Sequence, residues 1–129
     1  MSGNHLILLV EDDAANQLLV RAVLEPAGYR VDVASTATQA LEHLNTLTPA
    51  LILMDLGLPG KDGLSLTRLL KSFSTTTKIP VVAMTGHTSL QVRHDALAAG
   101  CAGFISKPID IHTFPTRVAE WIDGRTSDA

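Results

Sequence analysis

Acidic, hydroxyl and basic side chains follow four short apolar runs of this sequence. In chain order they are Glu11, Asp12 and Asp13, then Asp55, then Thr85, and finally Ser106 and Lys107. Clustered carboxylates repel one another, so they favour a hard divalent cation that prefers oxygen ligands. Mg²⁺ fits this set because it keeps several waters and accepts one or two carboxylates together with phosphate oxygens.

The same residue types suit phosphoryl transfer. A carboxylate can attack phosphorus and form an acyl phosphate, while a metal neutralises the incoming charge and an ammonium and a hydroxyl hold the other oxygens. Each residue alone is weak evidence, since an aspartate after a strand often only caps the next helix, a role that we assign to Asp13. The four strand ends together indicate phosphoryl chemistry on a metal.

Strand-length and helix-length segments alternate about five times, which positions these groups. Strands are expected at residues 6–10, 30–34, 50–54, 81–84 and 104–105, of which 30–34 alternates apolar and polar residues like an edge strand. Helices are expected at residues 14–27, 37–47, 64–73, 90–99 and 111–122. This alternation predicts an α/β fold, a doubly wound five-stranded parallel sheet with helices on both faces. Ligands of such sheets bind at the carboxyl ends of the strands, where the polar residues lie.

Composition narrows the class of protein. The chain has 129 residues, which fits a single domain over residues 1–129, with a core at about 5–122 and a tail or linker stub at 123–129. A net charge of −3 without a Lys/Arg cluster argues against direct nucleic-acid binding. One cysteine, Cys101, excludes an internal disulfide and is interpreted as a small buried residue, so a cytoplasmic location is expected. The apolar runs are too short for a membrane span.

Four motifs resemble the receiver domains of response regulators in two-component signalling, the chemotaxis-regulator-like phosphoacceptor fold. They are LVEDD at 9–13, LMDLGLPGKDG at 53–63, VVAMTG at 81–86 and GFISKP at 103–108. The resemblance spans about residues 6–122 and implies a flavodoxin-like topology with strand order 2-1-3-4-5. Asn16 and Gln17, after the acidic cluster, resemble receivers attached to hybrid sensor kinases.

The resemblance also implies a role for each residue at the strand ends. Asp55 would be the phosphoacceptor, and Thr85 and Lys107 would contact the phosphoryl group. The Mg²⁺ ligands would be Asp12, Asp55, the backbone carbonyl of Gly57 and, through water, Glu11. Thr85 and Phe104 would form the conformational switch, although Phe104 could also be only a core residue.

The implied activity is that of a signalling switch, which catalyses only its own phosphorylation and dephosphorylation and is otherwise not an enzyme. The phosphoryl group would come from a sensor histidine kinase or a histidine phosphotransfer domain. A downstream protein target or an attached domain would receive the signal, and the chain itself would contact no nucleic acid and no membrane.

Two other functions stay open at this point. An aspartyl-phosphate phosphatase of the haloacid dehalogenase type shares Mg²⁺ and a covalent phosphoaspartate, but it needs a second aspartate where this chain has Gly57. A flavodoxin-like binder of a phosphorylated cofactor needs a loop rich in Gly, Ser or Thr after the first strand. Glu11, Asp12 and Asp13 would instead repel a phosphate that lacks a metal.

The sequence departs from the family pattern at a few positions. Gly86 stands where the family usually has alanine, and Phe104 where tyrosine is common. The resemblance also predicts a cis peptide bond between Lys107 and Pro108.

Pro115 predicts a late start of the last helix, because proline in a helix interior loses a hydrogen bond and clashes with the preceding turn. Asp110 resembles an N-cap, but a helix begun there would place Pro115 beyond the first turn. Residues 111–113 should therefore form a turn, and the helix should begin at Phe114 or Pro115. Val118 and Trp121 should then face the sheet, and Arg117 and Glu120 should face water. In many receiver domains, the face made by the last helices and the last strand forms the active dimer. A shortened or re-angled last helix should pair poorly in that way, so we expect a monomer after phosphorylation, or a dimer through another surface.

Overall fold

Five parallel strands form one sheet in the order β2-β1-β3-β4-β5 in the computed structural model, which describes residues 5–57, 63–86 and 89–124. The strands are β1 (Leu6–Val10), β2 (Arg30–Ala34), β3 (Leu51–Asp55), β4 (Val81–Thr85) and β5 (Gly103–Ser106). The predicted parallel sheet, its strand order and the edge position of β2 are confirmed. Asp55 and Thr85 are the last residues of β3 and β4, one position further than the predicted strands extend.

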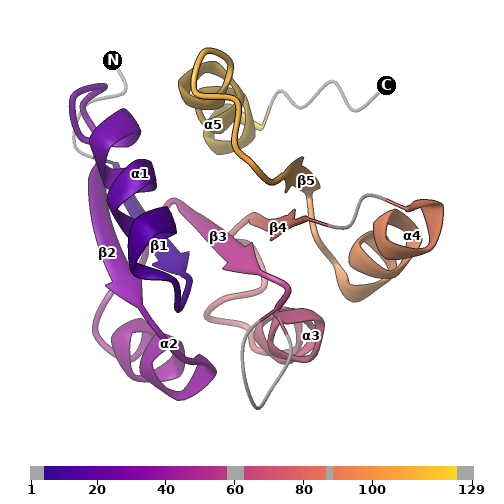
Figure 1. Ribbon diagram of the computed structural model, residues 1–129. Coiled ribbons are helices and arrows are strands. Elements are labelled where there is room, and N and C mark those ends of the chain that lie inside the picture. The colour runs from indigo at the N-terminus through magenta and orange to yellow at the C-terminus, as the bar shows by residue number, and fades with distance from the viewer. Residues whose placement is uncertain (1–4, 58–62, 87–88, 125–129) are drawn as a thin grey trace.

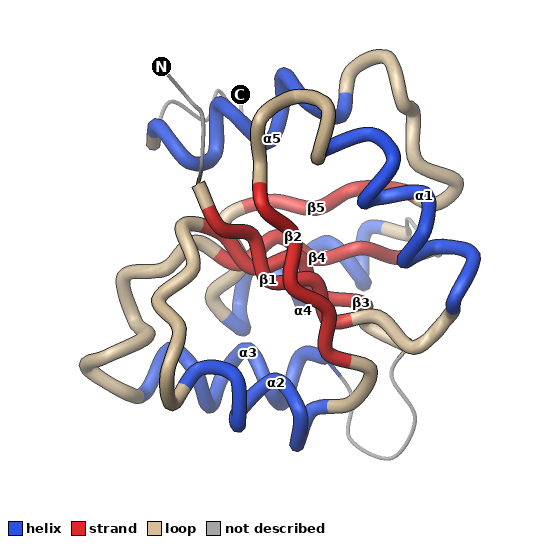
Figure 2. The backbone as a smooth tube through the Cα atoms, turned by 90° about the vertical axis from the view of Figure 1, so that its left-hand side faces the viewer, coloured by secondary structure: helices blue, strands red, loops and turns tan. Residues whose placement is uncertain are grey.

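Five helices cover both faces of this sheet. They are α1 (Ala14–Leu24), α2 (Ala37–Leu44), α3 (Gly63–Ser72), α4 (Leu90–Ala99) and α5 (Phe114–Asp123). Figures 1 and 2 show α1 and α5 on one face and α2, α3 and α4 on the other. No helix in the described part of the chain is long and apolar enough to cross a membrane.

Side-chain caps fix where three helices begin. The Asp13 carboxylate accepts from the Asn16 N–H at 2.9 Å, as predicted. Thr36 caps α2 in the same way, and Ser89 caps α4. Because a cap satisfies backbone donors that have no partner inside the helix, it sets the exact turn at which the chain becomes helical.

Two predicted helices are shorter than expected. The first was expected to reach residue 27 but ends at Leu24, since Pro26 has no N–H to continue the ladder. The second was expected to reach residue 47 but ends at Leu44, because the Asn45 N–H bonds the Glu42 carbonyl in a tighter turn.

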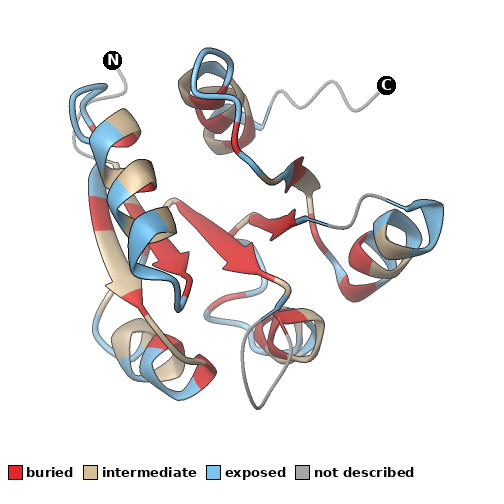
Figure 3. Cartoon of the chain, in the orientation of Figure 1, coloured by how far each residue is buried: buried red, intermediate tan, exposed pale blue. Residues whose placement is uncertain are grey.

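The core consists of two apolar layers, one on each face of the sheet. Every residue of β3 and β4 is buried, and alternate side chains enter opposite layers. Leu53 packs in the layer with α1 and α5, whereas Met54 packs in the layer with α2, α3 and α4. Figure 3 shows the buried residues along the strands and on the helix faces turned toward them. Cys101 is buried in the second layer, as predicted.

The face of α1 that packs on the sheet carries apolar residues at helical spacing. Val20 and Leu24 are fully buried, and Leu19 and Val23 pack beside them against the same core layer. Ala15 is exposed.

The start of α5 confirms the effect predicted for Pro115. Residues 111–113 form a turn, and the helix begins at Phe114, which places proline in the first turn, where no backbone donor is needed. Val118 and Trp121 are buried against the sheet, as predicted. The peptide bond between Lys107 and Pro108 is cis, also as predicted. The expected oligomeric state stays a prediction.

Arg117 does not face water as expected. Its side chain is partly buried, its Nη2 atom donates to the Phe104 carbonyl at 3.1 Å, and its guanidinium lies 4.8 Å from the centre of the Trp121 ring. Glu120 is only partly exposed. The long arginine side chain reaches back to β5, so its position on the helix did not indicate its surroundings.

Candidate functional site

Three carboxylates meet at the carboxyl ends of β1 and β3. Oxygen atoms of Glu11, Asp12 and Asp55 all lie within 4.8 Å of one another. Glu11 is fully buried and Asp55 is only 6% exposed, whereas Asp12 is exposed. A cation could therefore approach from the side of Asp12 and contact oxygens that are otherwise shielded from water.

Lys107 extends into this cluster from the end of β5. Its Nζ atom lies 2.9 Å from Glu11 Oε1 and 3.3 Å from Asp55 Oδ1. Its backbone N–H donates to the Thr85 carbonyl at 2.8 Å, which holds the start of this side chain beside the end of β4. The side chain thus extends past β4 to reach carboxylates on two strands further into the sheet.

Burial and the neighbouring charges together shift two pKa values of this cluster upward. Burial raises the pKa of Glu11 and the charge of Asp55 adds to the rise, which together outweigh the lowering by Lys107 and by the Asp13 N–H. Burial alone would lower the pKa of Lys107, but its contacts with Glu11 and Asp55 raise it overall. Three carboxylates around one ammonium leave an excess of negative charge, and these hard oxygen donors fit a bound Mg²⁺.

The Asp55 carboxylate is oriented from two sides. The backbone N–H of Gly57 donates to its Oδ1 atom at 3.0 Å, while Lys107 contacts the same oxygen. Next to it is an open pocket of about 300 Å³, which Thr85 and Gly86 also line. Asp55 and Thr85, from neighbouring strands, therefore line a common space large enough for a phosphoryl group.

Phe104 lies on β5, one strand away from the pocket. It pairs with Ala83 of β4 and is only partly buried, so it is not a fully enclosed core residue. Its ring lies under the guanidinium of Arg93 from α4, at 4.6 Å, and its carbonyl accepts from Arg117 of α5. Helices from both faces of the sheet therefore hold this residue.

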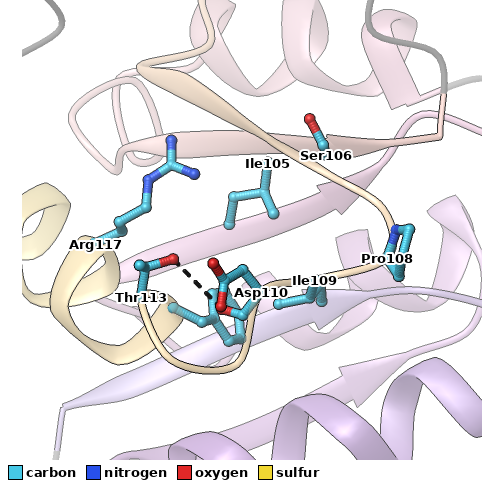
Figure 4. A pocket seen from close by; sticks show the side chains of 8 residues that line it. Ile105, Ser106, Pro108, Ile109, Asp110, Thr113 and Arg117 are labelled. Atoms are coloured by element: carbon cyan, nitrogen blue, oxygen red, sulfur yellow. Dashed lines mark hydrogen bonds between the residues drawn. The ribbon is translucent and has the colours of Figure 1, made fainter.

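A second pocket of about 200 Å³ lies where β5 leads into α5. Figure 4 shows Ser106 and Pro108 on one side of it and Thr113 and Arg117 on the other, with a hydrogen bond between Thr113 and Asp110. Its lining includes one carboxylate and one guanidinium, and not the Lys107 ammonium. It is therefore distinct from the acidic cluster.

Sequence reasoning missed the contact that Gln17 makes with this site. Its side-chain amide donates to the Glu11 carbonyl at 2.7 Å and to the Ser35 hydroxyl at 3.3 Å. Asn16 and Gln17 were noticed only as a family feature, and their spacing from Glu11 in the sequence gives no sign of the contact. Of the motif at 53–63, residues 58–62 lie outside the described residues.

Comparison with protein families gives one match over most of the chain. The family model of the response regulator receiver domain matches residues 7–119. The transcriptional regulatory protein PhoP of Escherichia coli is 34% identical over 112 residues, which are 87% of this chain and 49% of PhoP. The chain thus spans about half the length of that relative.

Solved structures show the same fold. A response regulator structure from Chloroflexus aurantiacus superposes with a TM-score of 0.89 at 26% identity, covering 93% of this chain and 98% of that one. The receiver domain of the sensor histidine kinase PA1611 from Pseudomonas aeruginosa gives 0.85 at 31% identity, covering 94% and 99%. That structure has a magnesium ion coordinated in its active-site cleft.

Proposed function

This chain belongs to the family of response regulator receiver domains of two-component systems, and we propose that Asp55 is its phosphoacceptor. One observation carries the proposal. The Asp55 carboxylate lies among the Glu11 and Asp12 carboxylates and the Lys107 ammonium, beside a pocket shared with Thr85. These are the groups that a carboxylate nucleophile needs in order to accept a phosphoryl group.

In the proposed reaction, an oxygen of Asp55 attacks the phosphorus of the donor. The new O–P bond forms as the bond between phosphorus and the leaving group breaks, and that group departs with the electron pair. The leaving group is acetate for acetyl phosphate and imidazole for a phosphorylated histidine. Lys107 and Thr85 hold the phosphoryl oxygens during transfer.

Mg²⁺ would be held by Asp12, Asp55 and the Gly57 carbonyl, with Glu11 contributing through water. When bound, it supplies the positive charge that neutralises the phosphoryl oxygens. The donor set supports this choice, because all of these ligands are hard oxygens and the cluster carries excess negative charge.

The wider role follows from the family. The chain is a signalling switch and not a conventional enzyme, and its only catalysis would be its own phosphorylation and dephosphorylation. Its phosphoryl donor would be a sensor histidine kinase or a histidine phosphotransfer domain. Thr85 and Phe104 would then carry the change to a downstream protein or an attached domain. We also propose a cytoplasmic location and a single domain with a core at about residues 5–122, although α5 continues to Asp123.

The two alternative functions gain no support from the site. The position two residues after Asp55 is Gly57, which offers no acid–base group for a phosphatase of the haloacid dehalogenase type. The loop after β1 carries carboxylates, which would repel the phosphate of a flavodoxin-type cofactor.

Intact-mass spectrometry after incubation with acetyl phosphate tests the proposal. One phosphoryl adduct should form with Mg²⁺ and none with a chelator. Asp55→Asn should abolish the adduct, whereas the control Asp110→Asn, at the start of the turn before α5, should retain it. An undiminished adduct on Asp55→Asn would show that another residue is the acceptor.

A further inference from the structure

We propose that Gln17 is a positioning residue for the loop that carries Glu11 and Asp12, so that its amide sets the affinity for Mg²⁺. This inference rests on the proposed function, since it assigns those carboxylates to the metal. Gln17 lies on α1, outside the cluster, and it acts only through the backbone that the carboxylates share.

The geometry around Glu11 is the first observation. Its backbone N–H donates to the Ala34 carbonyl at 3.0 Å, which continues the β1–β2 ladder by one residue. Its own carbonyl accepts from the Gln17 amide at 2.7 Å. Both backbone polar groups of Glu11 are therefore held, the N–H by β2 and the carbonyl by α1. Asp12 is the next residue, so its starting position depends on the same two bonds.

A second bond makes Gln17 a bridge. The same Nε2 atom lies 3.3 Å from the Ser35 hydroxyl, in the turn between β2 and α2. A carbonyl oxygen can only accept, so the group facing Glu11 must be the NH₂ end of the amide. One side chain thus connects the loop after β1 to the turn after β2.

Electrostatics explain why such a bridge matters. The three carboxylates repel one another, and Lys107 compensates only part of their charge. Without the Gln17 hydrogen bond, the repulsion is reduced at the lowest cost in free energy when the loop moves Asp12 outward. When the loop is held, the carboxylate oxygens are already close together before Mg²⁺ binds. Binding then costs less conformational entropy.

The test measures Mg²⁺ affinity of the full chain by calorimetric titration with Mg²⁺ alone. Gln17→Met keeps a side chain of similar length and helix propensity but removes the donor. A single hydrogen bond changes an equilibrium by about two- to tenfold, so the dissociation constant should rise by that factor. Gln39→Met is the matched control. Gln39 bonds the Ser35 N–H rather than the Glu11 carbonyl, and this variant should stay within about twofold of the original chain.

A second readout separates positioning from a general loss of structure. In phosphorylation by acetyl phosphate, Gln17→Met should need more Mg²⁺ for half-maximal rate but reach nearly the same rate at saturating Mg²⁺. A variant that is only less stable would have a lower melting temperature in chelator, but it would need no more Mg²⁺ for half-maximal rate. If Gln17→Met does not fold, Gln17→Ala removes the same donor and gives the same test.

The outcomes are distinct. An unchanged Mg²⁺ affinity in folded Gln17→Met would overturn this inference while leaving the phosphoacceptor assignment intact. An original chain that neither binds Mg²⁺ nor forms an adduct would instead overturn the proposed function. A loss as large in Gln39→Met as in Gln17→Met would assign the effect to the turn after β2 and also contradict the inference.

Discussion

The guanidinium of Arg93 lies 4.6 Å from the centre of the Phe104 ring, so a charged side chain of α4 covers the aromatic residue of β5. A cation over an aromatic face at a partly exposed site contributes about 0.5–1 kcal/mol. The contact is too weak to lock the ring but strong enough to bias its position. If Phe104 is a switch residue, Arg93 stabilises the position that the ring has here.

Removing that cation should therefore loosen Phe104. We expect Arg93→Ala to lower the free energy of unfolding by no more than about 1 kcal/mol and to increase the mobility of the ring. Arg93→Lys, which retains a cation, should show a smaller effect. NMR spectra of the chain with isotope-labelled phenylalanine can follow the ring before and after phosphorylation. An identical Phe104 signal in Arg93→Ala would show that the contact has no influence on it.

Glu11 should make the free energy of unfolding depend on pH when metal is absent. Burial raises its pKa above the ordinary 4.5, so the folded chain binds this proton more tightly than the unfolded chain. The resulting stabilisation is complete below about pH 4.5 and is lost as the pH rises through the raised pKa. The raised pKa of Lys107 acts only above its ordinary 10.5, so it does not contribute in this range.

Urea unfolding in chelator at a series of pH values checks this expectation. The free energy of unfolding should fall less steeply with rising pH in Glu11→Gln than in the original chain. Glu120→Gln on α5 removes a carboxylate away from the site and should leave the slope unchanged. If Glu11→Gln follows the slope of the original chain, another group must be responsible for it. Saturating Mg²⁺ should offset the loss at neutral pH in the original chain.

The same substitution at two glycines should have opposite effects on stability. A Cβ atom at Gly63 would lie 2.5 Å from the Asp55 carbonyl oxygen, which is backbone and cannot yield easily. We expect Gly63→Ala to destabilise the chain by about 1–3 kcal/mol, because the start of α3 must move away from β3. At Gly86 a Cβ would meet no atom of the described residues within 4 Å. Gly86→Ala should be neutral or stabilise by up to about 1 kcal/mol, by restricting the unfolded chain.

Chemical denaturation of both variants provides the comparison, and phosphorylation extends it to function. Gly63→Ala should also slow adduct formation, since the displaced segment adjoins Asp55. Equal stabilities for the two variants would mean that the backbone at Gly63 relaxes more easily than its packing suggests.

Much of the fold could be predicted because β1, β3 and β4 are continuous apolar runs and several helices begin at residues of recognisable type. Asp13 and Thr36 mark two helix starts by their types alone, and Pro115 marks a third. The gathering of Glu11 and Asp55 followed from the rule that parallel strands end at the same edge. These features are local in the sequence or follow from topology.

What could not be predicted depends on where long side chains extend. Arg117 was placed in water by its helix position, yet it reaches the Phe104 carbonyl. The bond between Lys107 and Glu11 joins residues 96 positions apart. The bridge made by Gln17 depends on how α1 lies relative to the end of β2, and the spacing of residues in the sequence does not indicate this placement.

The two flanks of the sheet on either side of Asp55 are held in different ways. Asp55 ends a strand that is buried on both faces and hydrogen-bonded to a neighbouring strand on each side, so the proposed phosphoacceptor stands on a firmly held part of the sheet. Toward β2, the neighbouring loops are fastened together by the amide of Gln17. Toward β5, the α4 side holds Phe104 through the weak contact with Arg93, while Arg117 of α5 bonds its carbonyl from the other face. We therefore expect strain that arises at the middle of the sheet to be released toward one flank only, the one with β5. In such a change β3 should stay in place, and β5 with α4 should move.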